Sequence, residues 1–205
     1  MRSIMRLALG AASMMLALGP ETAGAAPSFT TEYSYYSVSG ATPTAIYASL
    51  LRHLQRVNGK KHHAFTSIRI SSPRTVRTAK GCRVESLSVR FLIRMPRHSN
   101  EASLSPNNRR LWRQFSSFVK RHEETHRAIW MACARSITAR VMPAQGCDQA
   151  ARKVIEQTKA ACRKKDAAFD AAEGRRLDNH PFMRAAVAPI YTPIRARKKA
   201  ALQAN

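Results

Sequence analysis

Five consecutive residues carry the side chains best suited to catalysis: His122-Glu123-Glu124-Thr125-His126. They follow the pattern HExxH and lie inside a long stretch with helical periodicity. Residues i and i+4 of a helix share one face, so both imidazoles can reach one metal ion. Glu123 can then act as general base toward a water that the metal activates. The pattern predicts a zinc-dependent hydrolase, most simply a peptidase.

The element that must position these side chains is a long helix. Ser105-Pro106 is typical of a helix start, and the pattern runs to about Val141, before Pro143 and Gly146 end it. Seven residues at steps of three or four form one stripe: Phe115, Phe118, His122, His126, Ile129, Cys133 and Ile137. Both histidines are therefore expected to face the rest of the fold. Histidines in such a stripe are often plain core residues, but a carboxylate beside them is costly to bury without a cation or donor.

A catalytic zinc ion usually takes three protein ligands, so a third is needed. Asp166, Asp170 and Glu173 share one face of a second expected helix at i, i+4 and i+7. Any of them could bind the metal or orient a histidine ring, and His180, after that helix, is a further candidate. Ion pairing with neighbouring basic residues is the ordinary alternative for the carboxylates. His62-His63 is another possible contributor, although histidines at strand ends are usually just exposed.

The remaining patterns predict a small α+β domain. Alternating side chains predict strands at residues 29–38, 62–71 and 82–95, the last two joined by a hairpin connection at 72–81. Helices are expected at 42–57, 106–141 and 148–173, the third capped by Asp148. The short connection around Pro143 makes the last two helices antiparallel neighbours. We expect a β-α-β-β-α-α order: a small antiparallel sheet, an N-terminal helix and a C-terminal antiparallel helix pair, in a zincin-like arrangement.

The N-terminus has the features of a bacterial secretory signal peptide in residues 1–25: a positive start, an apolar run and an A-x-A cleavage site at Ala23-Gly24-Ala25. The run is short for a permanent span, although a membrane anchor is the alternative. No second apolar segment follows, so we expect a soluble, secreted or periplasmic protein without a transmembrane segment after cleavage. Residues 26–180 should form a single domain, and residues 181–205 a loose basic tail.

The four cysteines, Cys82, Cys133, Cys147 and Cys162, all follow the expected cleavage site. An even number in an exported chain predicts two disulfides, with three possible pairings. A zinc site built from them is less favoured because no CxxC pair exists. In a simple helical hairpin, Cys133 and Cys162 would be staggered by roughly 12 Å along the axis. That is too far for a bridge, so either the hairpin is offset or this pairing does not form.

The formal charge is +23, and +22 remains without residues 1–25. Such a charge predicts weak, salt-sensitive attraction to anionic cell-envelope polymers, lipid surfaces or nucleic acid. The few aromatic residues are not interleaved with the basic ones, as they would be in a stacking platform, so no specific nucleic-acid partner is expected. A scattered basic surface without any specific ligand is the simplest interpretation.

Several stretches, taken in order, resemble a known family. They are Tyr35-Tyr36-Ser37-Val38-Ser39-Gly40, Gly81-Cys82-Arg83-Val84, Trp112-Arg113-Gln114-Phe115, His122-Glu123-Glu124-Thr125-His126-Arg127, Cys147 and Phe169-Asp170. They resemble the bacterial predicted secreted zinc-dependent proteases, a family long catalogued as a domain of unknown function. The resemblance spans about residues 33–176, and the order of its motifs is more specific than HExxH alone.

The resemblance implies zinc at His122 and His126, with Glu123 as general base, and the same β-α-β-β-α-α order. It makes Asp170, at a family position, the first choice for the third ligand, ahead of Glu173 and His180. It also favours the disulfide Cys82–Cys147, because both cysteines stand at family positions. The substrate would be a peptide or protein. Hydrolysis also needs an oxyanion partner, which the sequence does not name; the candidates include a tyrosine, such as Tyr35 or Tyr36, and the many arginines.

The chain departs from the family pattern at the end of the helix expected at residues 148–173. Members tend to carry Thr-x-His-Gly after the aromatic-Asp pair, whereas this chain has Glu173 at the Thr position and Arg175-Arg176 at the His-Gly positions. This departure favours a catalytically degenerate member that binds anionic cell-envelope polymers through its basic surface. Two further alternatives are a metal-dependent amidase acting on cell-wall peptides, since HExxH does not define the substrate, and a basic surface binder with an accidental HExxH.

Overall fold

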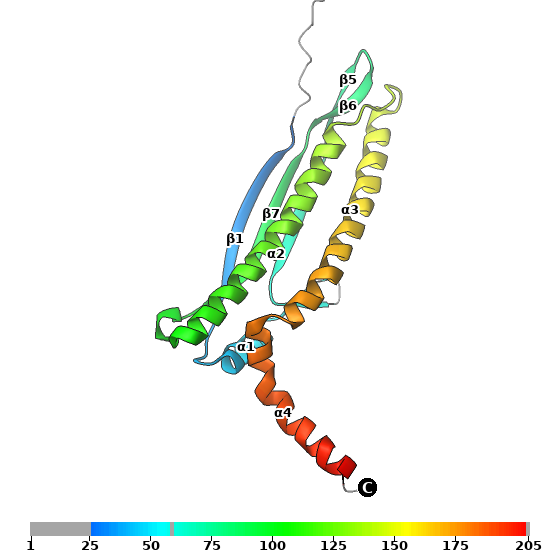
Figure 1. Ribbon diagram of the computed structural model, residues 1–205. Helices are drawn as coiled ribbons and strands as arrows, with labels where there is room; N and C mark the ends of the chain where they lie inside the picture. The colour runs from blue at the N-terminus through cyan, green and yellow to red at the C-terminus, as the bar shows by residue number, and fades with distance from the viewer. Residues whose placement is uncertain (1–25, 58–59, 204–205) are drawn as a thin grey trace, which may run out of the picture.

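A computed structural model describes residues 26–57 and 60–203 (Figure 1), so the expected signal peptide lies outside the described residues. The described part is a mixed α+β fold. Its strands are β1 (Ser28–Val38), β2 (Gln55–Val57), β3 (Lys60–His62), β4 (Phe65–Ile70), β5 (Arg74–Thr78), β6 (Gly81–Ser86) and β7 (Ser88–His98). Its helices are α1 (Pro43–Arg52), α2 (Pro106–Thr138), α3 (Cys147–Asp178) and α4 (Pro181–Gln203), with a short 3₁₀ turn at Glu101–Ser103.

The main sheet has the strand order β1-β7-β4. β7 pairs antiparallel with β4 but parallel with β1, in the register Ser28↔Ser88 to Val38↔His98. The expectation of a purely antiparallel sheet is therefore wrong. Between β1 and β7 the chain passes through α1, β4 and two hairpins, and this long excursion brings it back in its original direction, as a parallel pair requires. The hairpins form separate two-stranded ribbons, β2-β3 and β5-β6.

Helix α2 lies along the sheet, and α3 runs beside it (Figure 1). On β7 the alternate residues Val89, Phe91, Ile93 and Met95 are buried, as the period-two pattern of this stretch predicts. At the start of α2 the Ser105 hydroxyl accepts a hydrogen bond from the Asn108 amide, which confirms the expected N-cap. Phe115 and Ile137 of the expected stripe on α2 are almost fully buried, and so is Trp112, one turn before Phe115.

Several predicted boundaries differ from the structure. α1 ends at Arg52, and the residues beyond it form the β2-β3 ribbon rather than more helix. The expected hairpin connection at 72–81 contains β5, which pairs with β6. α2 ends at Thr138, and α3 starts after Gly146, whose left-handed backbone (φ 66°) turns the chain into the helix, rather than at Asp148.

The expectation of a loose tail beyond Pro181 is wrong, because this segment is the helix α4. Phe182, Met183 and Ala186, in its first two turns, are buried in the same core as Trp112 and Phe115. The Phe182 ring centroid lies 4.6 Å from that of Phe115. The weakly patterned Ala/Arg/Lys-rich sequence does not reveal this docking, which depends on three residues in the first two turns. The start of α4 is therefore part of the domain.

Both predicted disulfides form, Cys82–Cys147 and Cys133–Cys162, with Cα–Cα distances of 5.9 and 6.4 Å. The first confirms the pairing that the resemblance favours. The second forms because the hairpin is offset: residues 139–146 separate α2 from α3, and within them Met142 makes a two-way backbone bridge with Cys82. None of the helices in the described part is both long and apolar enough to cross a bilayer.

Candidate metal centre

Helix α2 brings the two histidines of the HExxH stretch together on its inner face. The Nε2 atoms of His122 and His126 lie 3.0 Å apart. The side chain of His126 is 11% exposed and that of His122 is 20% exposed, so both rings face inward but can be reached from solvent. Phe169 of α3 fixes their orientation: its ring stacks on His122 and meets His126 edge-on, with centroids 4.9 and 5.1 Å away. The expected placement of both histidines is confirmed.

Helix α3 supplies a third donor to the same point. Asp170 Oδ1 lies 3.3 Å from His122 Nε2 and 3.0 Å from His126 Nε2. These three donor atoms, hereafter the donor cluster, all lie within 4.8 Å of one another. Two other candidates for the third position have different contacts. Glu173 accepts a hydrogen bond from Arg176 at 2.8 Å, and the ring of His180 packs against Phe118 at a centroid distance of 5.4 Å.

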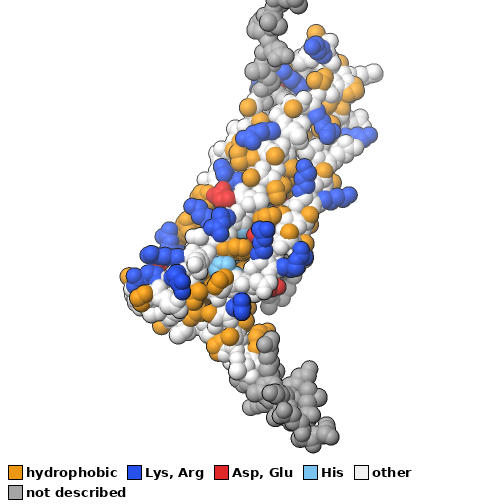
Figure 2. Space-filling view, viewed as in Figure 1, with side chains coloured by type: hydrophobic (Ala, Val, Ile, Leu, Met, Phe, Trp, Pro, Cys, Tyr) orange, Lys and Arg blue, Asp and Glu red, His pale blue; other side chains and the backbone are white. Residues whose placement is uncertain are grey.

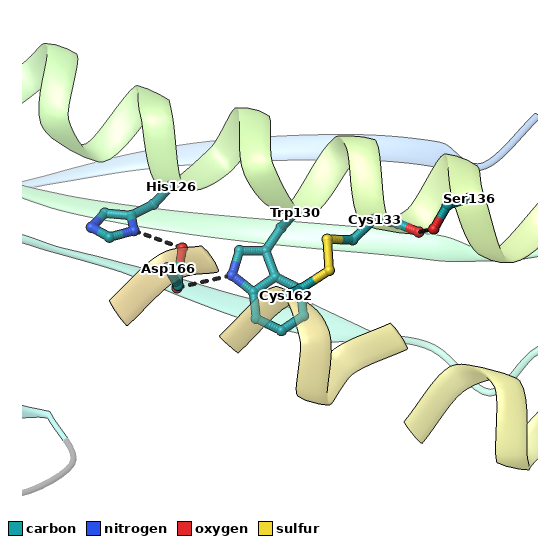
Figure 3. Close-up of a disulfide and its surroundings, with 6 residues drawn as sticks. All are labelled: His126, Trp130, Cys133, Ser136, Cys162 and Asp166. Carbon is teal, nitrogen blue, oxygen red and sulfur yellow. Dashed lines mark hydrogen bonds and ion pairs between the residues drawn. A yellow bond between two sulfur atoms is a disulfide. The ribbon is translucent and has the colours of Figure 1, made fainter. Parts of the chain in front are cut away.

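Asp166, one turn before Asp170, contacts the ring nitrogen of His126 that points away from the donor cluster (Figure 3). Its Oδ1 accepts a hydrogen bond from His126 Nδ1 at 2.8 Å, and its Oδ2 accepts one from Trp130 Nε1 at 3.0 Å. A proton on Nδ1 leaves the other ring nitrogen, Nε2, for the donor cluster. The Cys133–Cys162 disulfide joins the same two helices close by, since Cys162 is one turn before Asp166 on α3. Trp130 and the disulfide therefore define where Asp166 sits.

The electrostatics of the donor cluster favour a positive charge at its centre. Burial lowers the pKa of His126, but hydrogen bonds and charge attraction from Asp166 and Asp170 outweigh it and raise this pKa to about 10. Burial raises the pKa of Asp170, and contacts with the two histidines more than compensate, so the net shift is downward. The two carboxylates therefore favour the protonated, positively charged form of the His126 ring. A divalent ion can replace its Nε2 proton.

The spacing of the donors suits a zinc ion. Zinc binds nitrogen and oxygen at about 2.0–2.1 Å in a tetrahedron, whose edges are then about 3.3 Å long. The three edges within the donor cluster are 3.0, 3.3 and 3.0 Å. Two imidazoles and one carboxylate are also a ligand set that zinc uses in catalytic sites, with a fourth position left open. The donors thus fit the metal without rearrangement of the helices.

Glu123 lies next to the donor cluster and is 3% exposed. Its Oε2 accepts a hydrogen bond from the Thr66 hydroxyl of β4 at 2.8 Å. Burial raises the pKa of Glu123, while Thr66 and the two histidines oppose that shift. Glu124, the other carboxylate of the stretch, faces β1 instead, where it accepts hydrogen bonds from Tyr33 and Arg127. Glu123 alone of these two can act at the donor cluster.

Two cavities meet at the donor cluster, and His122, Glu123 and Asp170 line both. The larger, of about 870 Å³, is bounded by strand β4 on one side and by α3 residues such as Lys159 and Arg163 on the other. The smaller, of about 340 Å³, lies between α2, α3 and residues 62–64. Ligand sites are typically concave spaces of this size range. The donor cluster is therefore accessible from two directions.

Other residues singled out from the sequence have different positions. Tyr36 is buried and donates to the His63 carbonyl at 2.5 Å, and burial raises its pKa to about 12. Tyr35 is exposed and lies under the Arg97 guanidinium, 4.1 Å from the ring centroid. Neither tyrosine lines the two cavities, whereas His62 lines both. Basic side chains are scattered over the visible face of α2 and α3 rather than gathered into one patch (Figure 2).

Two contributors to the site, Thr66 and Trp130, were missed by sequence reasoning. Trp130 is four residues after His126, so the helical spacing could have placed it on the same face. Nothing in the sequence singles out Thr66, because its role depends on β4 packing against α2.

The architecture and the donor cluster together define a small α+β domain with a candidate metal site on a helix pair. Residues 33–178 match the family described as bacterial protein of unknown function (DUF922). The match covers well over half of the chain, which therefore belongs to this family. No curated protein and no solved structure gives a significant match.

Proposed function

We propose that the protein is a zinc-dependent hydrolase that cleaves peptide bonds. The observation that carries the proposal is the convergence of His122, His126 and Asp170 on one point, with the buried carboxylate of Glu123 beside it. A structural histidine pair would need neither a third donor at this spacing nor a carboxylate buried next to it. The zincin-like character expected from the sequence rests on the same four residues.

His122, His126 and Asp170 would hold the ion, and Asp166 would keep His126 in the tautomer that binds it. Bound zinc supplies Lewis-acid chemistry: it makes a water more acidic and polarises a carbonyl group. Glu123 is placed to take a proton from the attacking water and to pass it to the leaving amine. Burial favours this role because it raises the pKa of Glu123 and so makes the carboxylate a stronger base. Thr66 holds one oxygen of that carboxylate in place.

A peptide is the substrate that the surroundings favour. Strand β4 is an edge of the main sheet among the described residues, and five of its six residues line the larger cavity. An edge strand can pair through its main chain with an extended peptide, which would lay successive peptide bonds beside the donor cluster. A metal-dependent amidase acting on cell-wall peptides would use the same geometry, so both share this proposal.

The proposed location is outside the cytoplasm, where the two disulfides are stable. The signal peptide expected in residues 1–25 agrees with this location. The alternative of a degenerate, polymer-binding member depended on the basic residues at the family His-Gly positions. The exposed Arg176 pairs with the largely buried Glu173, and Asp170 completes the donor cluster without that family histidine. Active hydrolysis is therefore the better-supported proposal.

Metal content of the purified mature protein tests the proposal. Elemental analysis should give about one zinc per chain, lost in His126→Ala and in Asp170→Ala but retained in Asp178→Ala, a matched change near the exposed end of α3. Glu123→Gln should retain zinc and lose hydrolysis of a peptide library. Absence of zinc from the wild type, even after incubation with excess metal at neutral pH, would refute the proposal.

A further inference from the structure

We propose that the smaller cavity is a specificity pocket for a large apolar side chain, leucine or phenylalanine in size, next to the peptide bond that is cleaved. This inference rests on the proposed peptidase function and adds the substrate class. The cavity has about 340 Å³ of space, which is ample for one such side chain but small for a folded segment of a partner.

Away from the donor cluster the lining of this cavity is mostly apolar; its polar members are Glu173, which is paired with Arg176, and the neighbours His62 and His63. Helix α2 contributes Phe118 and Val119, and Leu177 of α3 closes the far end. Phe118 and Leu177 also pack on the main core, so this wall is fixed by the fold. An apolar side chain entering here would leave water for an apolar surface, which is the favourable direction.

The space exists because α3 carries small residues where it faces this wall. Ala167, Ala171 and Gly174 line the cavity. Together with Asp170 they lie at helical spacings that share one face. A Cβ atom added at Gly174 would meet nothing within 4 Å. Larger side chains at these positions would fill the cavity, so its volume is a property of this sequence.

The position of the cavity ties it to cleavage. His122, Glu123 and Asp170 line both cavities, so they lie where the smaller cavity meets the larger cavity along β4. A peptide extended along β4 would reach the donor cluster from the larger cavity and could place one side chain beyond it, between α2 and α3. The bond nearest the donor cluster would then be flanked by that apolar side chain, whereas an acidic side chain there would lose its hydration and share the cavity with Glu173.

Gly174→Leu tests the inference because it fills the cavity from the α3 side. Leucine is a better helix former than glycine, so the substitution should not destabilise α3. Ala168→Leu is the matched control: it adds a leucine to an exposed position on the same helix that lines neither cavity. Both variants should bind the same amount of zinc as the wild type, which separates loss of the pocket from loss of the metal site.

Two readouts are needed, one of which does not require activity. Saturation-transfer NMR should detect binding of N-acetylphenylalaninamide and N-acetylleucinamide, but not N-acetylglycinamide, to wild type and Ala168→Leu, with loss in Gly174→Leu. A set of quenched peptides varied at one position should be cleaved roughly 10- to 100-fold faster with Leu or Phe than with Gly or Asp. Gly174→Leu should abolish this preference.

The outcomes separate the two proposals. Zinc-free, inactive wild-type protein that still binds the two apolar amides, with loss in Gly174→Leu, would refute the peptidase and, with it, the role of the cavity in specificity. Zinc-loaded, active protein whose preference is unchanged in Gly174→Leu would refute the pocket alone. Binding of decanoate without binding of either amide would also overturn the inference, because it would point to a lipid chain instead of a peptide side chain.

Discussion

Asp166→Asn is the most direct test of how the helix pair builds the metal site. The carboxylate of Asp166 accepts two hydrogen bonds, from His126 Nδ1 at 2.8 Å and from Trp130 Nε1 at 3.0 Å. An asparagine side chain of the same shape has only one acceptor oxygen, so one of the two N–H groups would face an NH₂ group. The substitution also removes the negative charge that favours cation binding at His126.

The expected loss follows from these contacts. Removing the group behind a metal-binding histidine typically weakens metal affinity about 10- to 100-fold, or roughly 1.4–2.7 kcal/mol. The side chains of His126 and Asp166 are only 11% and 25% exposed, so water replaces the lost contact poorly and the upper half of this range is expected. Trp130→Phe leaves the hydrogen bond between Asp166 and His126 in place, so it should weaken zinc binding by no more than about threefold.

Competition with a chromophoric chelator at pH 7.5 measures these affinities. Asp178→Asn is the control, because it makes the same change in charge near the exposed end of α3. If zinc binds Asp166→Asn within threefold of this control, Asp166 does not position His126. If Trp130→Phe weakens binding more than Asp166→Asn, the order of importance argued from the hydrogen bonds is wrong.

Four further predictions concern protonation, catalysis and stability. Because the pKa of His126 is raised to about 10, zinc binding at pH 7.5 should release about one proton, and zinc affinity should rise about tenfold per pH unit toward pH 10. Calorimetry in two buffers of different ionisation enthalpy measures the proton release, and a binding heat that does not depend on the buffer would contradict this prediction. Glu123→Gln should lower hydrolysis at least about 100-fold while zinc content stays the same, and hydrolysis that persists would exclude Glu123 as the base. Replacing Cys133 and Cys162 together by serine should lower the free energy of unfolding by about 4 kcal/mol in urea titrations, since the bridge spans 29 residues. An unchanged midpoint of urea unfolding would show that the bridge does not constrain the unfolded chain. Phe182→Ala should cost about 3–5 kcal/mol if α4 is docked as described, and a change below 1 kcal/mol would show that α4 is not part of the core.

The sequence predicts the site better than it predicts the sheet. Helical spacing is enough to place His122 and His126 on one face, and the helix start at Ser105-Pro106 was confirmed. Four members of the expected stripe are buried (Phe115, His126, Cys133 and Ile137), and the other three are partly buried. Side-chain alternation likewise identified the buried face of β7. Alternation does not say which strand lies beside which, so the parallel partner of β7 could not be found in this way.

The choice among Asp166, Asp170 and Glu173 depends on how far α3 slides along α2. The sequence leaves this open, because a simple hairpin puts Cys133 and Cys162 out of reach of one another. The residues between the two helices and the backbone bridge of Cys82 with Met142 set the offset. With the observed offset, Asp170 lies next to the Nε2 atoms of both histidines, and Asp166 lies next to Nδ1 of His126. A long-range contact therefore decides what local spacing leaves undetermined.

The parallel pairing of β1 with β7 has a consequence for the speed of folding. Every pair in this ladder joins residues 60 positions apart, from Ser28 with Ser88 to Val38 with His98. Contacts at such separation must overcome a large loop-closure entropy before they stabilise anything, so the sheet should close slowly compared with the formation of α2 and α3. Because the chain is synthesised from its N-terminus, β1 emerges long before its partner. Until then its backbone groups are unpaired and open to other chains, so early folding is the stage at which this protein is most exposed to aggregation.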